Sequence, residues 1–411
     1  MLDITRPSTI TLVKGSPGVG KTTLVLRSLK DVKKSFFVSY NETLDSLTKK
    51  MERLGIDKNK NIEFRRGLSG SGRALNRQVS EIISQMEGGA VVVIDSIDAM
   101  LESVESDFGM RTLLQVIYSS AKQHKASLIL ITEGSTMLSD RLSYISDIII
   151  SVELEVDKGK ITRYAEIEKD RDRMISKRRY NFTLESGVTI FDGSVNIENE
   201  IYGYNPIVFP EDIKIGDGQE FLGRILFILD HRTPAIFSYY MRMLMVSHFL
   251  NKGFQVLLYL RPDEEHSSIM NDIKKLTGLE NPEIFIFKTS EEAENRKAIE
   301  QYESMLSNKK TLHIYDALSN EALYMKDPIQ YEDVVRKFTS AQSRQKATVI
   351  GFGYSWLKTL EVQKKYASII YATYVYENDV FLRGIRPSTS AYHVMIDNET
   401  KKLSIKFTRI M

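Results

Sequence analysis

The sequence predicts an α/β protein of two tandem domains, each with a mainly parallel sheet flanked by helices. Apolar runs typical of buried strands alternate with amphipathic segments through the first half of the chain. The second half repeats this alternation in outline. The stretch between the halves is rich in Gly, Pro and Asn, which favour turns. We therefore expect a domain at 1–192, a linker at 193–219 and a second domain at 220–411.

The first domain should end in antiparallel edge hairpins that follow its parallel strands. Its strands are expected at 9–13, 35–40, 62–65, 90–95, 126–132, 147–154, 162–169, 180–184 and 188–191. The second domain is expected to contain a long apolar helix at 235–250. Its strands are expected at 224–230, 255–260, 311–318, 347–354, 369–376, 392–397 and 403–408.

Composition narrows the class of protein. The 411 residues are enough for two domains of ordinary size. The formal net charge is only +2, so no overall field draws the chain to nucleic acid or membranes. Cysteine is absent, which excludes disulfides and thiolate metal sites. No apolar run reaches the ~18 residues of a membrane span, and the N-terminus lacks a signal-peptide pattern, so we expect a cytoplasmic protein without membrane insertion.

The stretch from Lys14 to Thr23, KGSPGVGKTT, has the Walker A (P-loop) pattern between an apolar strand and a helix. Its glycines let backbone amides face phosphate oxygens, and the helix start adds partial positive charge. Lys21 should reach the β- and γ-phosphates of a nucleotide, and the Thr22 hydroxyl should hold Mg²⁺. The expected nucleotide-binding residues are Gly15, Ser16, Pro17, Gly18, Val19, Gly20, Lys21, Thr22 and Thr23.

Asp95 ends the fully apolar strand expected at 90–95. Open α/β sheets bind ligands at the carboxyl ends of their strands, so Asp95 fits the Walker B position. It should position Mg²⁺ together with Thr22, directly or through water. The alternative is that Asp95 merely caps the following helix. Asp98 is expected to be a cap or a solvated carboxylate.

The ordered motifs at 15–24, 36–43, 91–97, 129–133, 144–147 and 166–171 resemble the RecA-like ATPases, in particular the KaiC and RadA branch. The resemblance covers residues 1 to about 192. It implies Mg-ATP binding and hydrolysis to ADP and phosphate. It also implies a ring-type homo-oligomer, such as a hexamer, with the ATP site at the protomer interface. The short start and a basic cluster are similar to those of the archaeal gas-vesicle regulator GvpD, a KaiC-like relative.

The family carries a water-activating Glu after its second strand. By resemblance this position falls on Asn41, and Glu42 follows it. An amide can orient water but cannot take its proton, so hydrolysis is expected to be slow unless Glu42 substitutes. The alternative is that Glu42 is a solvated carboxylate at a helix start.

The resemblance also assigns Lys169 and Arg171 to the γ-phosphate of a neighbouring subunit, as a finger acting in trans. Residues two apart on a strand face one way. The alternative is a solvated edge of alternating charge at 169–173. The basic run 177–179 could contact nucleic acid or an acidic partner, but it lacks the interleaved aromatics of a stacking platform, which favours a solvated loop.

The second domain also resembles a RecA-like domain, but a degenerate one. Residues 230–237 stand where a second P-loop belongs and contain no Gly and no Lys-Thr pair. Asp316 would therefore have no metal to serve, and the domain is expected to act in assembly or partner binding. The run 263–266 is expected to be a solvated turn. The residues expected in the core are Trp356, Tyr371, Tyr374 and Tyr376.

The sequence thus predicts a KaiC-like ATPase or ATP-dependent regulatory switch that works through protein partners and self-assembly. One alternative is a RadA-like, DNA-dependent recombination or repair ATPase, which the near-neutral charge disfavours. A second alternative is an ATP-binding scaffold that does not hydrolyse ATP, which Asn41 keeps open.

Overall fold

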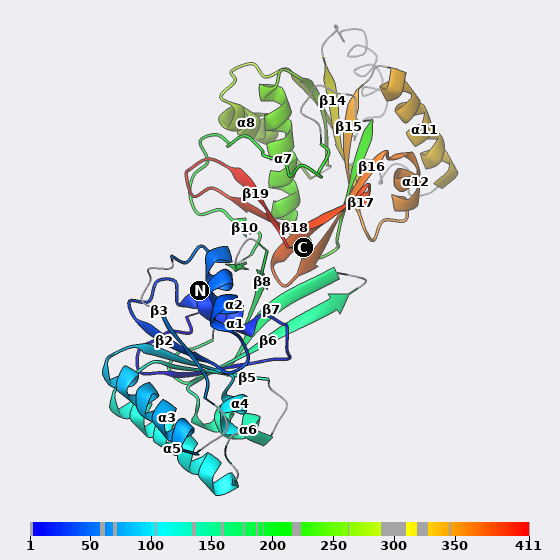
Figure 1. Cartoon of the computed structure of the whole chain (residues 1–411). Helices are drawn as coiled ribbons and strands as arrows, with labels where there is room; N and C mark the ends of the chain where they lie inside the picture. Colours follow the sequence, from blue (N-terminus) through cyan, green and yellow to red (C-terminus); the bar gives the residue numbers. More distant parts are fainter. Residues whose placement is uncertain are drawn as a thin grey trace. The chain divides into compact units, whose positions relative to one another are not determined.

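The structure is a computed structural model of the chain. It describes residues 3–57, 62–68, 72–102, 104, 106–133, 137–157, 160–175, 177–185, 188–191, 193–215, 223–261, 263–288, 310–318, 328–344 and 347–410. The chain divides into two compact units, Met1–Asp192 and Gly193–Met411 (Figure 1). Among the described helices, none is long and apolar enough to cross a membrane.

The first unit contains a sheet with the strand order β3-β2-β4-β5-β1-β6-β7-β8-β9 within its described residues. Neighbours from β3 to β6 in this order are parallel, and β7, β8 and β9 join antiparallel. The strands are β1 Ile10–Lys14, β2 Ser35–Ser39, β3 Ile62–Arg66, β4 Val91–Asp95, β5 Leu128–Thr132, β6 Ile148–Asp157, β7 Lys160–Asp170, β8 Arg179–Thr183 and β9 Thr189–Ile190.

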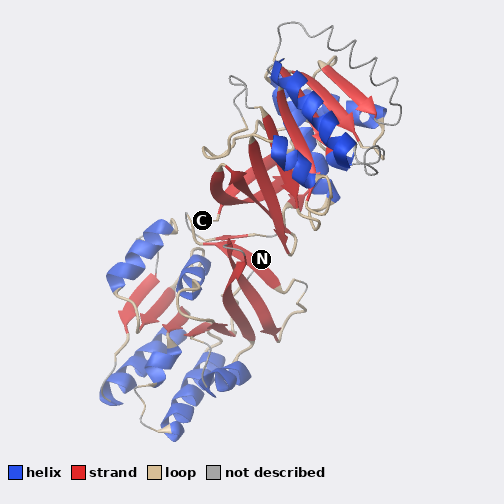
Figure 2. Cartoon of the chain, turned by 90° about the vertical axis from the view of Figure 1, so that its right-hand side faces the viewer, coloured by secondary structure: helices blue, strands red, loops and turns tan. Residues whose placement is uncertain are grey.

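Helices cover both faces of this sheet, as a buried parallel sheet requires (Figures 1 and 2). Phe37 and Val93 pack on one face with α1 and α2, whereas Phe36 and Val92 pack on the other face with α3, α4, α5 and α6. This is the two-residue alternation of strands. The helices are α1 Lys21–Ser28, α2 Leu44–Arg53, α3 Gly72–Glu87, α4 Ile97–Leu101, α5 Asp107–Gln123 and α6 Met137–Ile145.

The second unit repeats the strand order of the first. Its sheet runs β13-β12-β14-β15-β11-β16-β17-β18, so β11 takes the place of β1 and β14 that of β4, while β10 and β19 both pair with β18. The strands are β10 Val195–Asn196, β11 Arg224–Leu229, β12 Gln255–Leu260, β13 Ile284–Lys288, β14 Thr311–Asp316, β15 Thr348–Tyr354, β16 Ile369–Tyr376, β17 Asp379–Arg386, β18 Ser388–Asp397 and β19 Ser404–Arg409. The predicted α/β class, with two mainly parallel sheets flanked by helices, is confirmed.

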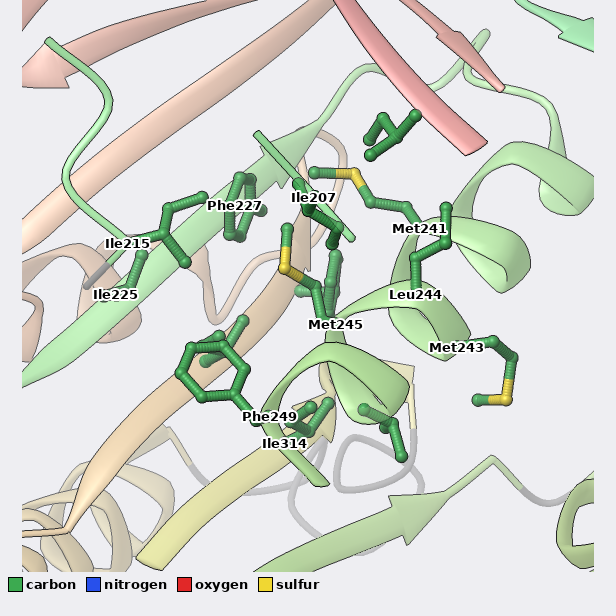
Figure 3. Close-up of a cluster of buried hydrophobic side chains, with 14 of the residues drawn as sticks. Ile207, Ile215, Ile225, Phe227, Met241, Met243, Leu244, Met245, Phe249 and Ile314 are labelled. Carbon is green, nitrogen blue, oxygen red and sulfur yellow. The ribbon is translucent and has the colours of Figure 1, made fainter. Parts of the chain in front are cut away.

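Helix α7 (Ala235–Asn251) forms the centre of the second unit's core. The helix is apolar nearly all round, as is typical of a buried helix. Its Met241, Met245 and Phe249 belong to one cluster with Phe227 of β11 and Ile207 (Figure 3). Helix α8 (His266–Thr277) packs beside α7, and α11 (Pro328–Arg344) and α12 (Leu360–Tyr366) lie on the other face of the sheet (Figure 1).

Residues 193–215, for which the sequence predicts a linker, pack against the second unit instead. Val195 and Asn196 form β10 and pair with β18. Ile207, Ile213 and Ile215 are buried in the same cluster as α7. The many turn-forming residues in this stretch led to the prediction of a linker, although its apolar residues are buried in the core. Residues 216–219 lie outside the described residues.

The structure differs from the sequence-based expectations at further places, and the local sequence pattern explains those at Trp356 and β17. Trp356 is 58% exposed rather than in the core, because it lies past the end of β15, where strand alternation no longer buries every second residue. Tyr371 and Tyr374, within β16, are buried as expected. The expected strands of the second domain lack β13 and β17. For β17, Gly384 and Pro387 favour turns, and its pairing with β18 is irregular there.

We expect Phe227→Ala to lower the free energy of unfolding of the second unit by about 3–5 kcal/mol, because a large buried ring leaves a cavity. Phe227 stacks on Phe352 and Tyr371, with ring centroids 5.4 and 5.3 Å away. This loss of stability is measured by urea unfolding followed through the fluorescence of Trp356, the only tryptophan in the sequence. Val208→Ala, at an exposed position, should cost less than about 0.5 kcal/mol. Equal losses in both variants would contradict this account of the core.

Candidate nucleotide-binding site

The loop between β1 and α1 has the close backbone approach that the Walker A pattern demands. Gly15 has a φ of +151°, and a Cβ built on it would lie 2.2 Å from the carbonyl oxygen of Val152 on β6. Gly18 has a φ of +82°, and a Cβ there would meet no atom within 4 Å. A side chain at Gly15 would therefore collide with β6. At Gly18 there is room for a side chain, but the positive φ favours glycine.

Helix α1 begins immediately after this loop. Its N-cap residue is Gly20, with a φ of +109° and no side chain that could cap the first backbone N–H groups. The partial positive charge of the helix therefore faces the loop, an arrangement that suits an anion.

Lys21 folds back over the loop. Its ammonium group donates to the carbonyl oxygens of Gly15, at 2.5 Å, and Ser16, at 2.9 Å. Burial lowers the pKa of Lys21, while the nearby carboxylates, Asp95 first among them, oppose that shift. The Lys21 ammonium group is thus already held by carbonyls of the loop whose N–H groups would bind phosphate.

Thr22 and Asp95 meet at the mouth of the loop. The Thr22 hydroxyl donates to Oδ2 of Asp95 over 2.7 Å. Asp95 is only 6% exposed, and burial raises its pKa, which the Thr22 hydrogen bond counteracts. A hydroxyl and a carboxylate are the hard oxygen ligands that Mg²⁺ prefers. Among the described residues, no group of three or more His, Cys, Asp or Glu side chains is placed to hold a metal ion. A Mg²⁺ held by Thr22 and Asp95 would take its other ligands from phosphate and water.

Strand β5 lies between β1 and β4, which brings Thr132 and Glu133 to the same edge of the sheet. Asp98 accepts hydrogen bonds from the Thr132 hydroxyl and the Glu133 N–H, both 2.9 Å long. Asp98 is therefore neither the cap nor the solvated carboxylate that we expected. The cap of α4 is Ser96, whose hydroxyl accepts from the Ala99 N–H over 3.3 Å.

Asn41 and Glu42 point to different elements. The Asn41 amide donates to the Ser96 hydroxyl, just past β4, over 3.4 Å. Glu42 instead accepts from the Ser46 hydroxyl at 3.0 Å and forms an ion pair with Lys50, both on α2. Glu42 is therefore not a free solvated carboxylate, and its charge is partly neutralised.

Lys169 and Arg171 lie together at the C-terminal end of α6. The Lys169 ammonium donates to the carbonyls of Ser143 and Ser146, at 2.8 and 2.7 Å. Arg171 donates to the Tyr144 carbonyl at 2.8 Å, lies 3.7 Å from the carboxylate of Asp147 and is 43% exposed. Burial lowers the pKa of Lys169, and Arg171 adds to this effect. Both cations therefore face one way, as their spacing predicts.

The basic run 177–179 contacts other groups of its own unit, although the single carboxylate Glu166 offsets only one of its three positive charges. Arg179 pairs with Glu166 at 3.2 Å and stacks 4.0 Å from the centroid of the Tyr164 ring. Lys177 lies 5.0 Å from the centroid of the Tyr180 ring. These contacts favour a folded charged edge over a surface open to nucleic acid.

In the second unit, the loop that corresponds to the P-loop is a tight turn closed by its own side chains. Asp230 accepts from the backbone and side chain of Arg232, at 2.9 and 3.1 Å. The Thr233 N–H donates to the Asp230 carbonyl at 2.9 Å, and its hydroxyl lies 3.1 Å from that of Thr373. Pro234 then precedes α7. No amide cradle for phosphate is present among these residues.

Arg242 takes the position opposite Asp316. This arginine on α7 is 1% exposed, and its Nη1 lies 4.0 Å from Oδ2 of Asp316 at the end of β14. Its Nη2 forms an ion pair with Glu264, which is buried rather than part of the solvated turn that we expected. The signal in the sequence is a lone Arg inside the apolar helix run 235–251.

Residues 5–194 match the family model of the KaiC ATPase. No curated protein matches the chain. Among solved structures, a KaiC-like protein from the hyperthermophilic archaeon Pyrococcus horikoshii is similar at 22% identity and a TM-score of 0.41, over 46% of this chain and 92% of that one. The family match covers nearly all of the first unit, which is therefore similar to the KaiC ATPase, and nearly all of the second unit lies outside the match.

We expect Gly15→Ala to weaken ATP binding by about tenfold or more, because the added methyl would displace the loop from Val152. Gly72→Ala is the matched control, since its Cβ would meet nothing within 4 Å. Titration with a fluorescent ATP analogue measures both affinities. Similar affinities of the two variants would show that the loop tolerates the shift.

Proposed function

We propose that the first unit binds Mg-ATP and hydrolyses it slowly, and that the protein is an ATP-dependent switch acting through self-assembly and a protein partner. The observation that carries the proposal is the 2.7 Å hydrogen bond between Thr22 and Asp95 at the mouth of the P-loop. It joins the residue types that Mg-nucleotide sites use at the positions where they use them.

In this proposal the amides of 15–20 and the start of α1 bind the phosphates, and Lys21 leaves its carbonyl partners to contact the β- and γ-phosphates. Thr22 and Asp95 would hold Mg²⁺, which neutralises phosphate charge when bound. Thr132, fixed by Asp98, would contact the nucleotide's terminal phosphate as a sensor.

The attacking water would face Asn41, whose amide points to the end of β4. An amide orients water without accepting its proton, so turnover should be slow. Glu42 is held by Lys50 and Ser46, which favours a structural role for it at the start of α2.

Purified protein should release phosphate from ATP slowly but above the rate of a Lys21→Ala blank, which also loses ATP binding. Tight ATP binding with no turnover above the blank would instead make the protein an ATP-binding scaffold.

We expect Asn41→Glu to raise turnover, towards the roughly 10²- to 10⁴-fold that a general base contributes. Steady-state phosphate release measures it, with Glu42→Gln assayed in parallel. No gain from Asn41→Glu together with a large loss in Glu42→Gln would identify Glu42 as the base.

Lys169 and Arg171 are proposed to complete the ATP site of a neighbouring copy in a ring-type assembly such as a hexamer. The Lys169→Ala/Arg171→Ala double variant should bind ATP as the wild-type protein does but hydrolyse it more slowly than the wild type. Mixing it with Lys21→Ala should restore turnover, because each variant supplies what the other lacks. Arg173→Ala, an exposed neighbour, is the control. Failure to complement, with both variants folded, would remove the action in trans.

A DNA-dependent recombination or repair activity is the weaker candidate, because the formal net charge of the chain is only +2 and Lys177 and Arg179 of the basic run already contact groups of their own unit.

A further inference from the structure

The second unit contains a cavity of about 460 Å³ on the side of α7 that faces α8. This volume is in the range of small-molecule sites. Its lining comes from three segments: α7, α8 and the chain at 197–202. The residues that give it chemical character are Tyr202, Tyr239, Tyr240, Glu200, Asp272 and Lys275.

The aromatic part of the lining consists of three tyrosines, Tyr202, Tyr239 and Tyr240. The rings of Tyr239 and Tyr240 are edge-to-face, with centroids 5.4 Å apart and planes at 72°. Tyr202 enters from the third segment and is itself largely exposed. Aromatic faces carry partial negative charge and attract cations.

Two carboxylates add full negative charge to the lining. The Tyr239 hydroxyl donates to Oδ2 of Asp272 over 2.5 Å, and the Tyr202 hydroxyl donates to Glu200. Burial raises the pKa of Tyr239, and the Asp272 carboxylate raises it further, so this phenol stays a donor. With Lys275 as the cation of the lining, these charged residues sum to −1. Such a site disfavours phosphates and other anions.

The wall at 197–202 is held in place from within the unit. The buried Asn398 accepts from the N–H groups of Glu198 and Asn199, at 3.0 and 3.3 Å. Tyr204 forms a β-bridge with Leu403. The cavity is therefore pre-formed, which spares a ligand the cost of ordering its wall.

We propose that this cavity binds an organic cation, an ammonium or guanidinium group with an apolar body. The apolar body fills the space beside Met243 and Leu276, and the charged end lies among the tyrosines and carboxylates. A free organic cation and a basic side chain of a peptide share this chemistry. The inference is independent of ATP binding by the first unit.

Isothermal titration of the full chain with phenethylamine tests the proposal, with neutral 2-phenylethanol as the matched probe. The cation should bind saturably and at least about tenfold more tightly than the alcohol. Asp272→Asn and Glu200→Gln should each weaken the cation by about tenfold while leaving thermal unfolding unchanged. Glu361→Gln, an exposed acid on α12, should leave binding unchanged.

A capped Gly-Arg-Gly peptide and free propylguanidine, which carry the same single guanidinium charge, separate the two sources. Tighter binding of the peptide identifies a basic side chain of a peptide, and tighter binding of propylguanidine identifies a free organic cation. Equal affinity for phenethylamine and 2-phenylethanol, or no saturable binding of any cation up to about 10 mM, overturns the proposal without a variant. Unchanged affinity in both folded carboxylate variants overturns it as well.

Discussion

The hydrogen bond between Thr22 and Asp95 joins the start of α1 to the end of β4, segments 73 residues apart. It exists because β1 and β4 are parallel strands whose carboxyl ends share one edge of the sheet, with β5 between them. The partner of the buried carboxylate is a neutral hydroxyl. Asp95 therefore has a hydrogen-bond donor, and Lys21, a cation that acts on it, donates to loop carbonyls and not to this carboxylate. Its charge is thus available to a metal cation.

In the second unit, the carboxylate at the corresponding strand end lies beside a permanent cation, the guanidinium of Arg242. Asp316 ends the strand that corresponds to β4, and burial raises its pKa. Arg242 faces this carboxylate from α7 at 4.0 Å and pairs with Glu264 as well. A guanidinium stays charged at any ordinary pH, and a second one, Arg261, lies 3.6 Å from Glu264 and also acts on Asp316, so two cations offset these two carboxylates. The Tyr354 hydroxyl donates to Asp316 as well, over 2.9 Å, which leaves little charge there for a metal to neutralise. One fold thus carries an open carboxylate in one unit and a satisfied carboxylate in the other.

Features encoded in a continuous stretch could be predicted from the sequence. The glycine-rich loop, Asp95 and most of the strands depend on local pattern, and the order of the sheet follows from how such patterns connect. Features that depend on contacts between distant segments were missed. Asp98 accepts a hydrogen bond from Thr132 on the neighbouring strand, and Glu264 forms an ion pair with Arg242. The chain at 193–215 packs into the core of the second unit. Periodicity carries no information about such partners.

The most direct test of this contrast is the number of nucleotides bound per chain, measured by equilibrium dialysis of the full chain with a non-hydrolysable ATP analogue and Mg²⁺. This account predicts one nucleotide per chain and none in the Lys21→Ala variant. Two nucleotides per chain, or one that persists in the Lys21→Ala variant, would contradict it, because the second unit would then hold a nucleotide despite Arg242.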